Sequence, residues 1–138
     1  MAYWLFKSEP DAWSWEQQKK KGAKGEPWSG VRNFTAANNM KAMKKGDQGF
    51  FYHSGKAREI VGIVEVIGEY HPDPTDESGR FGLVEVKAVR DVPKPVTLAV
   101  IKADPKFKDM SLVKFSRLSV QPVTAEEWKR ICAMGGVK

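Results

Sequence analysis

A chain of 138 residues with 41% hydrophobic and 11% aromatic side chains can form one domain over residues 1–138, and no apolar run is long enough to span a membrane. One cysteine excludes an internal disulfide, two histidines offer little for a metal site, and the first residues lack signal-peptide features, so we expect a cytoplasmic protein without metal, cofactor or membrane contact. The net charge of +6 lies entirely in residues 1–58, with eleven basic and five acidic side chains beside four of the five tryptophans, which favours a nucleic-acid partner.

The first predicted elements are a strand and a short helix. Residues 3–7 form an aromatic and aliphatic run that ends shortly before Pro10, which is typical of a strand. Ser14 and Gln17 have the spacing of a capping box and predict a helix through about Lys21.

A second helix and a second strand are expected next. Residues 33–45 have helical periodicity, with Ala36, Met40 and Met43 on one stripe, and a glycine follows them. Residues 48–53 then predict a strand.

The middle of the chain predicts an antiparallel hairpin. Residues 59–70 form a strand in which Gly62 and Gly68 suggest bulges or bends. The loop 71–80 is rich in proline, aspartate and glycine, and residues 81–89 alternate as the returning strand.

The last third predicts further strands and a final helix. Residues 97–109 are rich in turn signals and carry no assignment, whereas residues 112–123 predict one or two strands. Thr124 and Glu127 form a second capping box, and the helix that follows turns a stripe containing Cys132 inward. Five to six strands with glycine bends and flanking helices predict an α+β fold, a small mixed β-barrel.

Residues 28–34 (WSGVRNF) are the densest candidate for a binding site. Trp28 supplies a flat ring for stacking, Gly30 allows close backbone approach, Arg32 can pair with a phosphate, and Asn33 can bind one base edge. The alternative is structural, with Asn33 as a helix cap and Trp28 in the core.

Residues 50–55 (FFYHSG) are a second candidate, because polar groups at the end of a strand can contact a base edge. His53 can equally be a structural histidine. Neighbouring strand residues point to opposite faces, so His53 and Ser54 do not suit a base and nucleophile pair. Glu9 could act as an acid or base, or orient Arg32 or a lysine.

Five segments resemble the EVE domain family over nearly the whole chain. They are YWLFKSEP (3–10), WSGVRNF (28–34), NNMKAMKKGD (38–47), FFYHS (50–54) and RLSVQPVTAEEW (117–128). The resemblance implies a PUA-like β-barrel of five to six strands flanked by helices and related to YTH domains. It also implies an aromatic pocket for one modified base of single-stranded or flipped DNA or RNA.

The resemblance also implies a set of pocket and rim residues. The expected ligand-binding residues are Lys7, Ser8, Trp28, Gly30, Val31, Arg32, Asn33, Tyr52, His53, Ser54, Arg117 and Ser119. Three features depart from the family pattern: Asn38 stands where an arginine is frequent, Gly55 stands where an asparagine is frequent, and the loop 71–80 is short.

The sequence therefore predicts a non-catalytic module that holds a base such as a methylated cytosine or adenine. Trp28 and Tyr52 would form walls, and phosphates would be attracted by Arg32, Lys41, Lys44 and Lys45. Two alternatives stay open. One is a nucleic-acid hydrolase that uses His53 and Glu9, and the other is a protein-binding adaptor with the same barrel.

Overall fold

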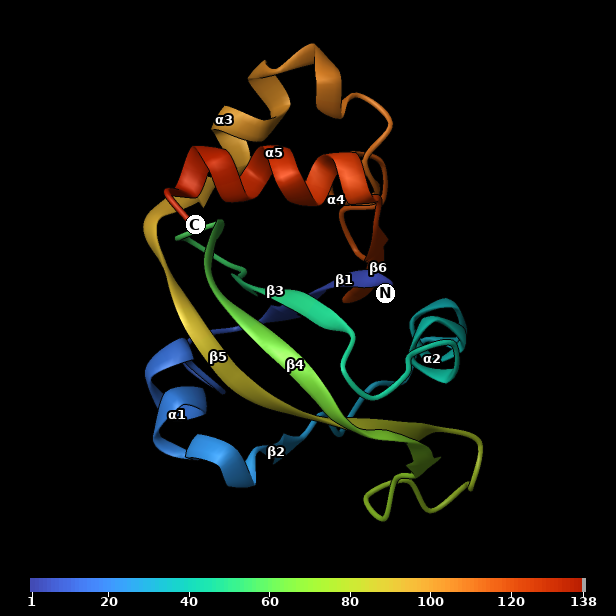
Figure 1. Cartoon of the computed structure of the whole chain (residues 1–138). Coiled ribbons are helices and arrows are strands. Elements are labelled where there is room, and N and C mark those ends of the chain that lie inside the picture. Colours follow the sequence, from blue (N-terminus) through green and yellow to red (C-terminus); the bar gives the residue numbers. More distant parts are fainter. Residues whose placement is uncertain (138) are drawn as a thin grey trace.

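The computed structural model describes residues 1–137 and is built on one six-stranded mixed sheet (Figure 1). The strands follow the order β2-β5-β4-β3-β1-β6, in which β1 and β3 are parallel and the other pairs antiparallel. Their bounds are β1 Tyr3–Ser8, β2 Glu26–Pro27, β3 Gln48–His53, β4 Glu59–Pro72, β5 Gly82–Thr97 and β6 Val120–Val123.

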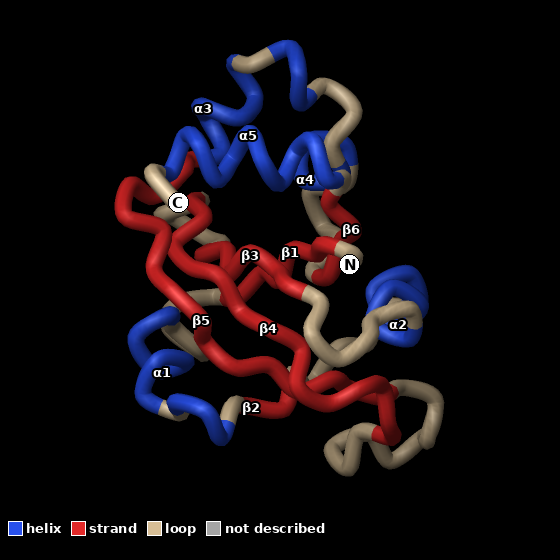
Figure 2. Tube along the Cα trace, in the orientation of Figure 1, coloured by secondary structure: helices blue, strands red, loops and turns tan. Residues whose placement is uncertain are grey.

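The helices lie around the sheet rather than between its strands (Figure 2). They are α1 Trp15–Lys20, α2 Phe34–Lys41, α3 Leu98–Ala103, α4 Ser111–Lys114 and α5 Ala125–Gly135, with short 3-10 helices η1 Gly22–Lys24 and η2 Pro105–Phe107. Helices α3, α4 and α5 gather at one end, while α1 and β2 lie towards the other. Helix α2 contacts the edge strand β6 and the inner strands β4 and β5, so it joins strands that are not neighbours in the sheet.

The helix starts predicted from capping residues are confirmed. Ser14 and Thr124 form complete capping boxes with Gln17 and Glu127. Asn33 caps α2, because its side chain accepts a hydrogen bond of 2.9 Å from the backbone N–H of Ala36. Helix α2 ends at Lys41, earlier than predicted, although the predicted apolar stripe is buried.

Strands β4 and β5 form a long, bent antiparallel pair. The predicted irregularities are confirmed, since the register shifts next to Gly62 and on both sides of Gly68. The prediction ended the second strand at Val89, but β5 continues to Thr97 through two prolines. Residues 92–95 are not paired with β4, so the two prolines, which have no backbone N–H to donate, interrupt no ladder hydrogen bond there.

The prediction of one or two strands over residues 112–123 is wrong for its first half. Residues 111–114 form α4, and only Val120–Val123 forms a strand. A short apolar run does not distinguish a strand from a buried helical turn, and Leu112 is buried on α4 against the core. The unassigned residues 97–109 form α3 and η2, and Thr97 caps α3.

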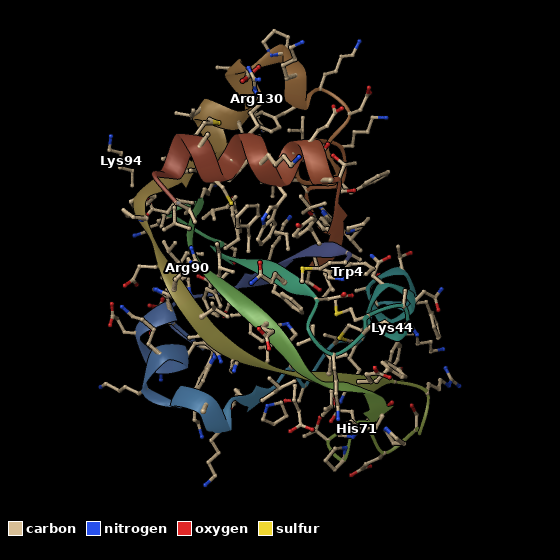
Figure 3. All side chains as sticks on the ribbon, in the orientation of Figure 1. Trp4, Lys44, His71, Arg90, Lys94 and Arg130 are labelled. Carbon is tan, nitrogen blue, oxygen red and sulfur yellow. The ribbon has the colours of Figure 1, made fainter. Side chains whose placement is uncertain are left out.

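The sheet separates two hydrophobic cores, and strand alternation decides which core each side chain enters. Phe6 and Phe51 pack with Trp28 on one face, whereas Leu5 and Phe50 pack with Trp128 on the other. Figure 3 shows side chains on both faces of the strands. This alternation also separates the polar residues at the ends of β1 and β3.

Within residues 1–137 no helix is long and apolar enough to cross a membrane. In the same residues no group of three or more His, Cys, Asp and Glu side chains is arranged to hold a metal ion. Cys132 is half-buried on α5 rather than fully buried, and burial raises the pKa of its thiol.

Candidate functional site

A cavity of about 460 Å³ lies beside Trp28, where β1 ends and the segment after β2 passes it. This volume is within the range of about 300–1,000 Å³ that is usual for small-molecule sites. The cavity is lined by Lys7, Ser8, Glu9, Ala12, Trp13, Glu26, Pro27, Trp28, Ser29, Gly30, Val31, Arg32 and Ser119.

Trp28 forms a fixed wall of this cavity. Its ring is 8% exposed, and it makes edge contacts with Phe6 at 5.2 Å and Phe51 at 5.7 Å between ring centroids. Its backbone N–H also donates to the carbonyl of Val84 at 2.8 Å. The indole therefore belongs to the core and also borders the cavity, so the structural and functional interpretations of Trp28 both apply.

Trp13 is a second aromatic residue of the cavity, and it was not among the predicted site residues. Its indole Nε1 donates to Gln18 Oε1 at 2.9 Å, and the fully buried Gln18 donates to the carbonyl of Val86 at 3.2 Å. The hydroxyl of Ser8 donates to the carbonyl of Trp13. These bonds hold Trp13 in place before any ligand binds, which reduces the entropy lost on binding.

Asp73 joins two parts of the cavity rim. Its Oδ2 accepts hydrogen bonds from the backbone N–H of Gly30 at 2.9 Å and from the guanidinium of Arg32 at 3.3 Å. Arg32 also donates to the hydroxyl of Thr75 at 3.1 Å. Gly30 has φ of +81°, a conformation that other residues rarely adopt, so this turn depends on glycine.

The Asp73 carboxylate is ionised in spite of its burial. Burial alone would raise its pKa, but hydrogen bonds from Thr75, the Gly30 N–H and Arg32 outweigh that effect and lower the pKa to about 2. The Asp73 side chain is fully buried, while that of Arg32 is 39% exposed and lies 5.8 Å from the Phe81 ring centroid. Part of the positive charge of Arg32 is therefore balanced inside the protein.

Lys7 borders the cavity from the end of β1. Its ammonium donates to the carbonyl of Ser116 at 2.7 Å, and burial lowers its pKa. The carboxylates of Glu9 and Glu26 lie on the same lining, and Glu26 pairs with Lys21 at 3.4 Å. The cavity therefore combines aromatic walls with a balanced set of charges rather than a purely basic surface.

The structure brings part of the predicted site together. The predicted residues that line the cavity are Lys7, Ser8, Trp28, Gly30, Val31, Arg32 and Ser119. Asn33 and Arg117 line a neighbouring cavity instead, and the Asn33 oxygen is occupied as the cap of α2. Asp73 was also missed, because nothing in the spacing of the sequence pairs the loop 71–80 with Arg32.

Tyr52 and Ser54 do not reach the cavity beside Trp28, so the predicted pair of walls, Trp28 and Tyr52, is not formed there. Tyr52 alternates with Phe51 and faces the other core, where burial raises its pKa. Both residues line a different cavity of about 270 Å³, which Lys7 also borders. The cause is the strand alternation that places odd and even residues of β3 on opposite faces.

His53 lies on the Trp28 side of the sheet but has a structural contact. Its Nε2 accepts a hydrogen bond of 2.9 Å from the backbone N–H of Trp15, the first residue of α1. Burial lowers the pKa of His53, and the nearby Glu59 opposes this only partly. A neutral ring with Nε2 already engaged fits the structural alternative for His53 and leaves that nitrogen unavailable to a ligand.

The three lysines predicted to contact phosphate lie at the end of α2 distant from Arg32. Lys41 is the last residue of α2, and its ammonium lies 5.6 Å from the Tyr70 ring centroid. Lys44 and Lys45 follow in the turn before β3, where their backbone N–H groups are bound by Asp47 and Glu69. An eight-residue helix is about 12 Å long, so these lysines border the site at a distance.

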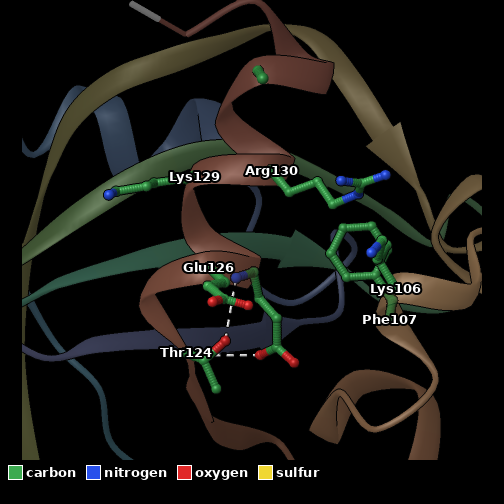
Figure 4. A pocket seen from close by; sticks show the side chains of 8 residues that line it. Lys106, Phe107, Thr124, Glu126, Lys129 and Arg130 are labelled. Carbon is green, nitrogen blue, oxygen red and sulfur yellow. Dashed lines mark hydrogen bonds between the residues drawn. The ribbon is translucent and has the colours of Figure 1, made fainter.

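A cavity of about 670 Å³ between α5 and η2 has different chemistry (Figure 4). Lys129 and Arg130 point to opposite sides of α5, and Arg130 is bound to Asp104 at 2.9 Å. Glu126 and Glu127 add negative charge, and the one aromatic ring of this lining, Phe107, is 1% exposed. It offers a flat ligand no exposed ring.

Comparison with known proteins gives a consistent result. The EVE domain model matches residues 2–134. Thymocyte nuclear protein 1 of chicken (Gallus gallus) is 35% identical over 164 residues, covering 96% of this chain and 68% of that protein. A crystal structure of a protein from Agrobacterium tumefaciens is 56% identical with a TM-score of 0.97, covering 99% of this chain and 94% of that chain.

Two further structures were solved with modified nucleic acid. The human THYN1 protein, in complex with DNA that contains 5-methylcytosine, is 30% identical with a TM-score of 0.92, and the match covers 98% of both chains. The YTH domain of Zygosaccharomyces rouxii MRB1, in complex with N6-methyladenosine RNA, is 20% identical with a TM-score of 0.59, covering 99% of this chain and 85% of that chain. The latter likeness concerns the fold alone. These matches confirm the predicted PUA-like α+β fold.

Proposed function

Because the chain belongs to the EVE domain family, we propose that it is a nucleic-acid-binding module that holds one modified base in the cavity beside Trp28. The observation that carries the proposal is this rigid cavity with two indole rings on its lining. The human relative bound to 5-methylcytosine DNA supports the choice of ligand.

The base would enter unstacked and lie against the indole walls of Trp28 and Trp13. Stacking of a base on an aromatic side chain contributes about 1–3 kcal/mol. A buried methyl group would add roughly 0.8 kcal/mol, which corresponds to a preference of about fourfold over the plain base. Selectivity for the modification therefore depends on how closely the cavity fits the methyl group.

The polar groups of the lining would bind the base edge and the adjacent phosphate. The ammonium of Lys7 is a partly buried hydrogen-bond donor on the lining, and Ser119 adds a hydroxyl to the same lining. Arg32 is exposed enough to reach a phosphate while Asp73 holds its guanidinium in place. Lys41, Lys44 and Lys45 would attract the strand electrostatically beyond the cavity.

The proposed role is non-catalytic. The hydrolase alternative needs His53 as a base near Glu9, but His53 Nε2 already accepts the Trp15 N–H. Glu9 accepts a hydrogen bond of 3.3 Å from the hydroxyl of Ser54, at the exposed end of the sheet. This arrangement directs the proton of Ser54 towards Glu9 and leaves His53 outside the pair.

The test is the binding of short single strands that carry 5-methylcytosine, N6-methyladenine or the plain bases, followed by fluorescence anisotropy. Trp28→Phe should weaken binding of the modified strand, because phenylalanine offers a smaller stacking surface than the indole. Trp128→Phe is the matched control, because Trp128 is equally buried at 7% but packs against Tyr3 and Phe50 in the other core.

Equal affinity for modified and plain strands would overturn modified-base binding. Absence of binding even at low salt would favour the protein-binding adaptor, since electrostatic attraction of phosphate is strongest there. Cleavage of a labelled strand that is lost in His53→Ala would favour the hydrolase. The cytoplasmic location stays a prediction that cell fractionation can test.

A further inference from the structure

The neighbouring cavity that contains Asn33 and Arg117 has a volume of about 300 Å³ and lies next to the cavity beside Trp28. We call it the second cavity. It is lined by Asn33, Thr35, Phe115, Arg117 and Leu118. The two cavities share two stretches of chain: Arg32 and Asn33 are consecutive, and so are Leu118 and Ser119, and in each pair one residue lines each cavity. The two spaces therefore lie on either side of the same two peptide segments.

Phe115 makes this second cavity unusual for a protein surface. Its side chain is 56% exposed, although it is a large aromatic ring next to the partly buried Leu118. A ring exposed in this way gains little from folding, so it contributes to stability far less than the buried phenylalanines do. It is nevertheless available as a stacking surface.

Hydrogen bonds from Gln121 and Lys7 hold the loop that carries Phe115 in place. The buried Gln121 donates from Nε2 to the carbonyls of Phe115 at 3.3 Å and Leu118 at 2.8 Å. Lys7 donates to the carbonyl of Ser116, and its own backbone N–H binds the carbonyl of Ser119 at 2.8 Å. The exposed ring thus stands on a segment that is already ordered, as a pre-organised binding surface would require.

We propose that the second cavity holds the base adjacent to the modified one, stacked against Phe115 with the Arg117 guanidinium at its side. This inference rests on the proposed function and extends it from one nucleotide to two. An aromatic ring beside an arginine binds any base through its π-face, so the second position accepts different bases. The amide of Asn33 and the hydroxyl of Thr35 supply the polar groups for its edge.

A neighbouring base fits this space better than an apolar partner does. The shared wall carries Arg32, whose guanidinium is held by Asp73 and is 39% exposed, so it can pair with the phosphate between two bases. The cation of Arg117 adds a second positive charge to a lining whose apolar part is Phe115 and Leu118. A ligand with flat rings joined by a negative linker matches both features, and two consecutive nucleotides have that form.

The experiment is a double-mutant cycle that removes the Phe115 ring and the neighbouring base, first separately and then together. Pentanucleotides with a central 5-methylcytosine carry a base or an abasic site at each neighbouring position, and they are titrated into the wild-type protein and Phe115→Ala. The ring deletion and the correct abasic position should each weaken binding about fivefold or more. Combined, they should weaken it no more than either change alone, because both remove the same contact.

Two control variants separate this contact from a general loss of apolar surface. Phe115→Tyr keeps a ring of the same shape and should retain the wild-type affinity. Val100→Ala removes another exposed apolar side chain, 50% exposed on α3 and outside both cavities, and should also bind normally. Thermal unfolding of each variant shows whether the fold is intact, as an exposed position leads us to expect.

The outcomes distinguish the two proposals. If the wild-type protein binds none of the strands, the proposed function fails, and this inference fails with it. If the wild type prefers the modified strand but Phe115→Ala and both abasic strands bind equally well, only the second base position is refuted. Losses that multiply for both abasic positions would also refute it, because the ring would then act independently of either neighbouring base.

Discussion

The Asp73→Asn substitution tests whether the rim of the cavity is held by one buried charge. Asparagine has almost the same shape as aspartate but carries no charge, and its NH₂ group can only donate. One oxygen of Asp73 accepts from both Gly30 and Arg32, and the other accepts from the N–H and hydroxyl of Thr75. The substitution therefore removes the anion that organises four donors.

The magnitude follows from the pKa of the carboxyl group. A lowering from 3.8 to about 2 corresponds to roughly 2.5 kcal/mol of stability at neutral pH. Because the folded pKa is the lower one, this contribution of Asp73 is complete above pH 4 and is lost as the pH falls towards 2. For a chain of this length we expect Asp73→Asn to lower the Tm by roughly 5–10 °C at pH 7.

Thermal unfolding between pH 2 and pH 7 measures both effects. The variant should be less stable at pH 7 and should lose less stability than the wild type between pH 4 and pH 2. Glu77→Gln is the matched control, since it removes an exposed carboxylate from the same loop. If Asp73→Asn unfolds like the wild type at pH 7, or shows the same acid dependence, the reasoning about a buried rim anion is refuted.

Three further substitutions test structural roles. His53→Gln keeps an acceptor for the Trp15 N–H but cannot gain a charge. Because burial lowers the pKa of His53 in the folded protein, the wild type should lose stability as the pH falls below about 6.5. The Tm of the variant should depend less on pH in this range. Gly62→Ala places a Cβ 2.1 Å from the Trp15 ring, and denaturant titration should show a loss of at least about 1–3 kcal/mol. Gln121→Met leaves the Phe115 and Leu118 carbonyls without their donor; we expect a loss of about 1–3 kcal/mol and faster amide exchange in residues 115–119, and unchanged exchange would contradict the anchoring role.

Features of the fold that depend on neighbouring residues were predictable from the sequence. The capping boxes that begin at Ser14 and Thr124 and the bulges at Gly62 and Gly68 are local effects of side-chain hydrogen bonding and of glycine. Helix α4 was not predictable in this way. Its four residues are helical because Leu112 is buried against the core, a tertiary contact that leaves no periodic signal in so short a segment.

In the candidate site, too, local features were predictable from the sequence, whereas contacts between distant segments were not. Segment 28–34 was identified because its aromatic, glycine, arginine and amide residues lie close together in the sequence, and the structure places residues 28–32 on one cavity and Asn33 on its neighbour. Tyr52 was placed beside Trp28 although alternation along β3 turns it to the other face. Trp13 lines the cavity from the segment before α1, and Asp73, in the loop after β4, binds the lining residues Gly30 and Arg32. Such contacts between distant segments depend on the sheet order rather than on sequence spacing.

The charges that would attract a nucleic-acid strand lie apart from the cavity that would select the modified base. Arg32 and Lys7 are the cations of the cavity lining, but the ionised Asp73 balances Arg32, and Glu9 and Glu26 oppose Lys7 on the same lining. The excess charge of residues 1–58 therefore lies outside the cavity, including the lysines beyond the end of α2. Salt should then weaken binding of modified and plain strands by the same factor, because it screens phosphate contacts that both strands make. The ratio of the two affinities depends on the shape of the cavity, so it should stay constant as the ionic strength rises.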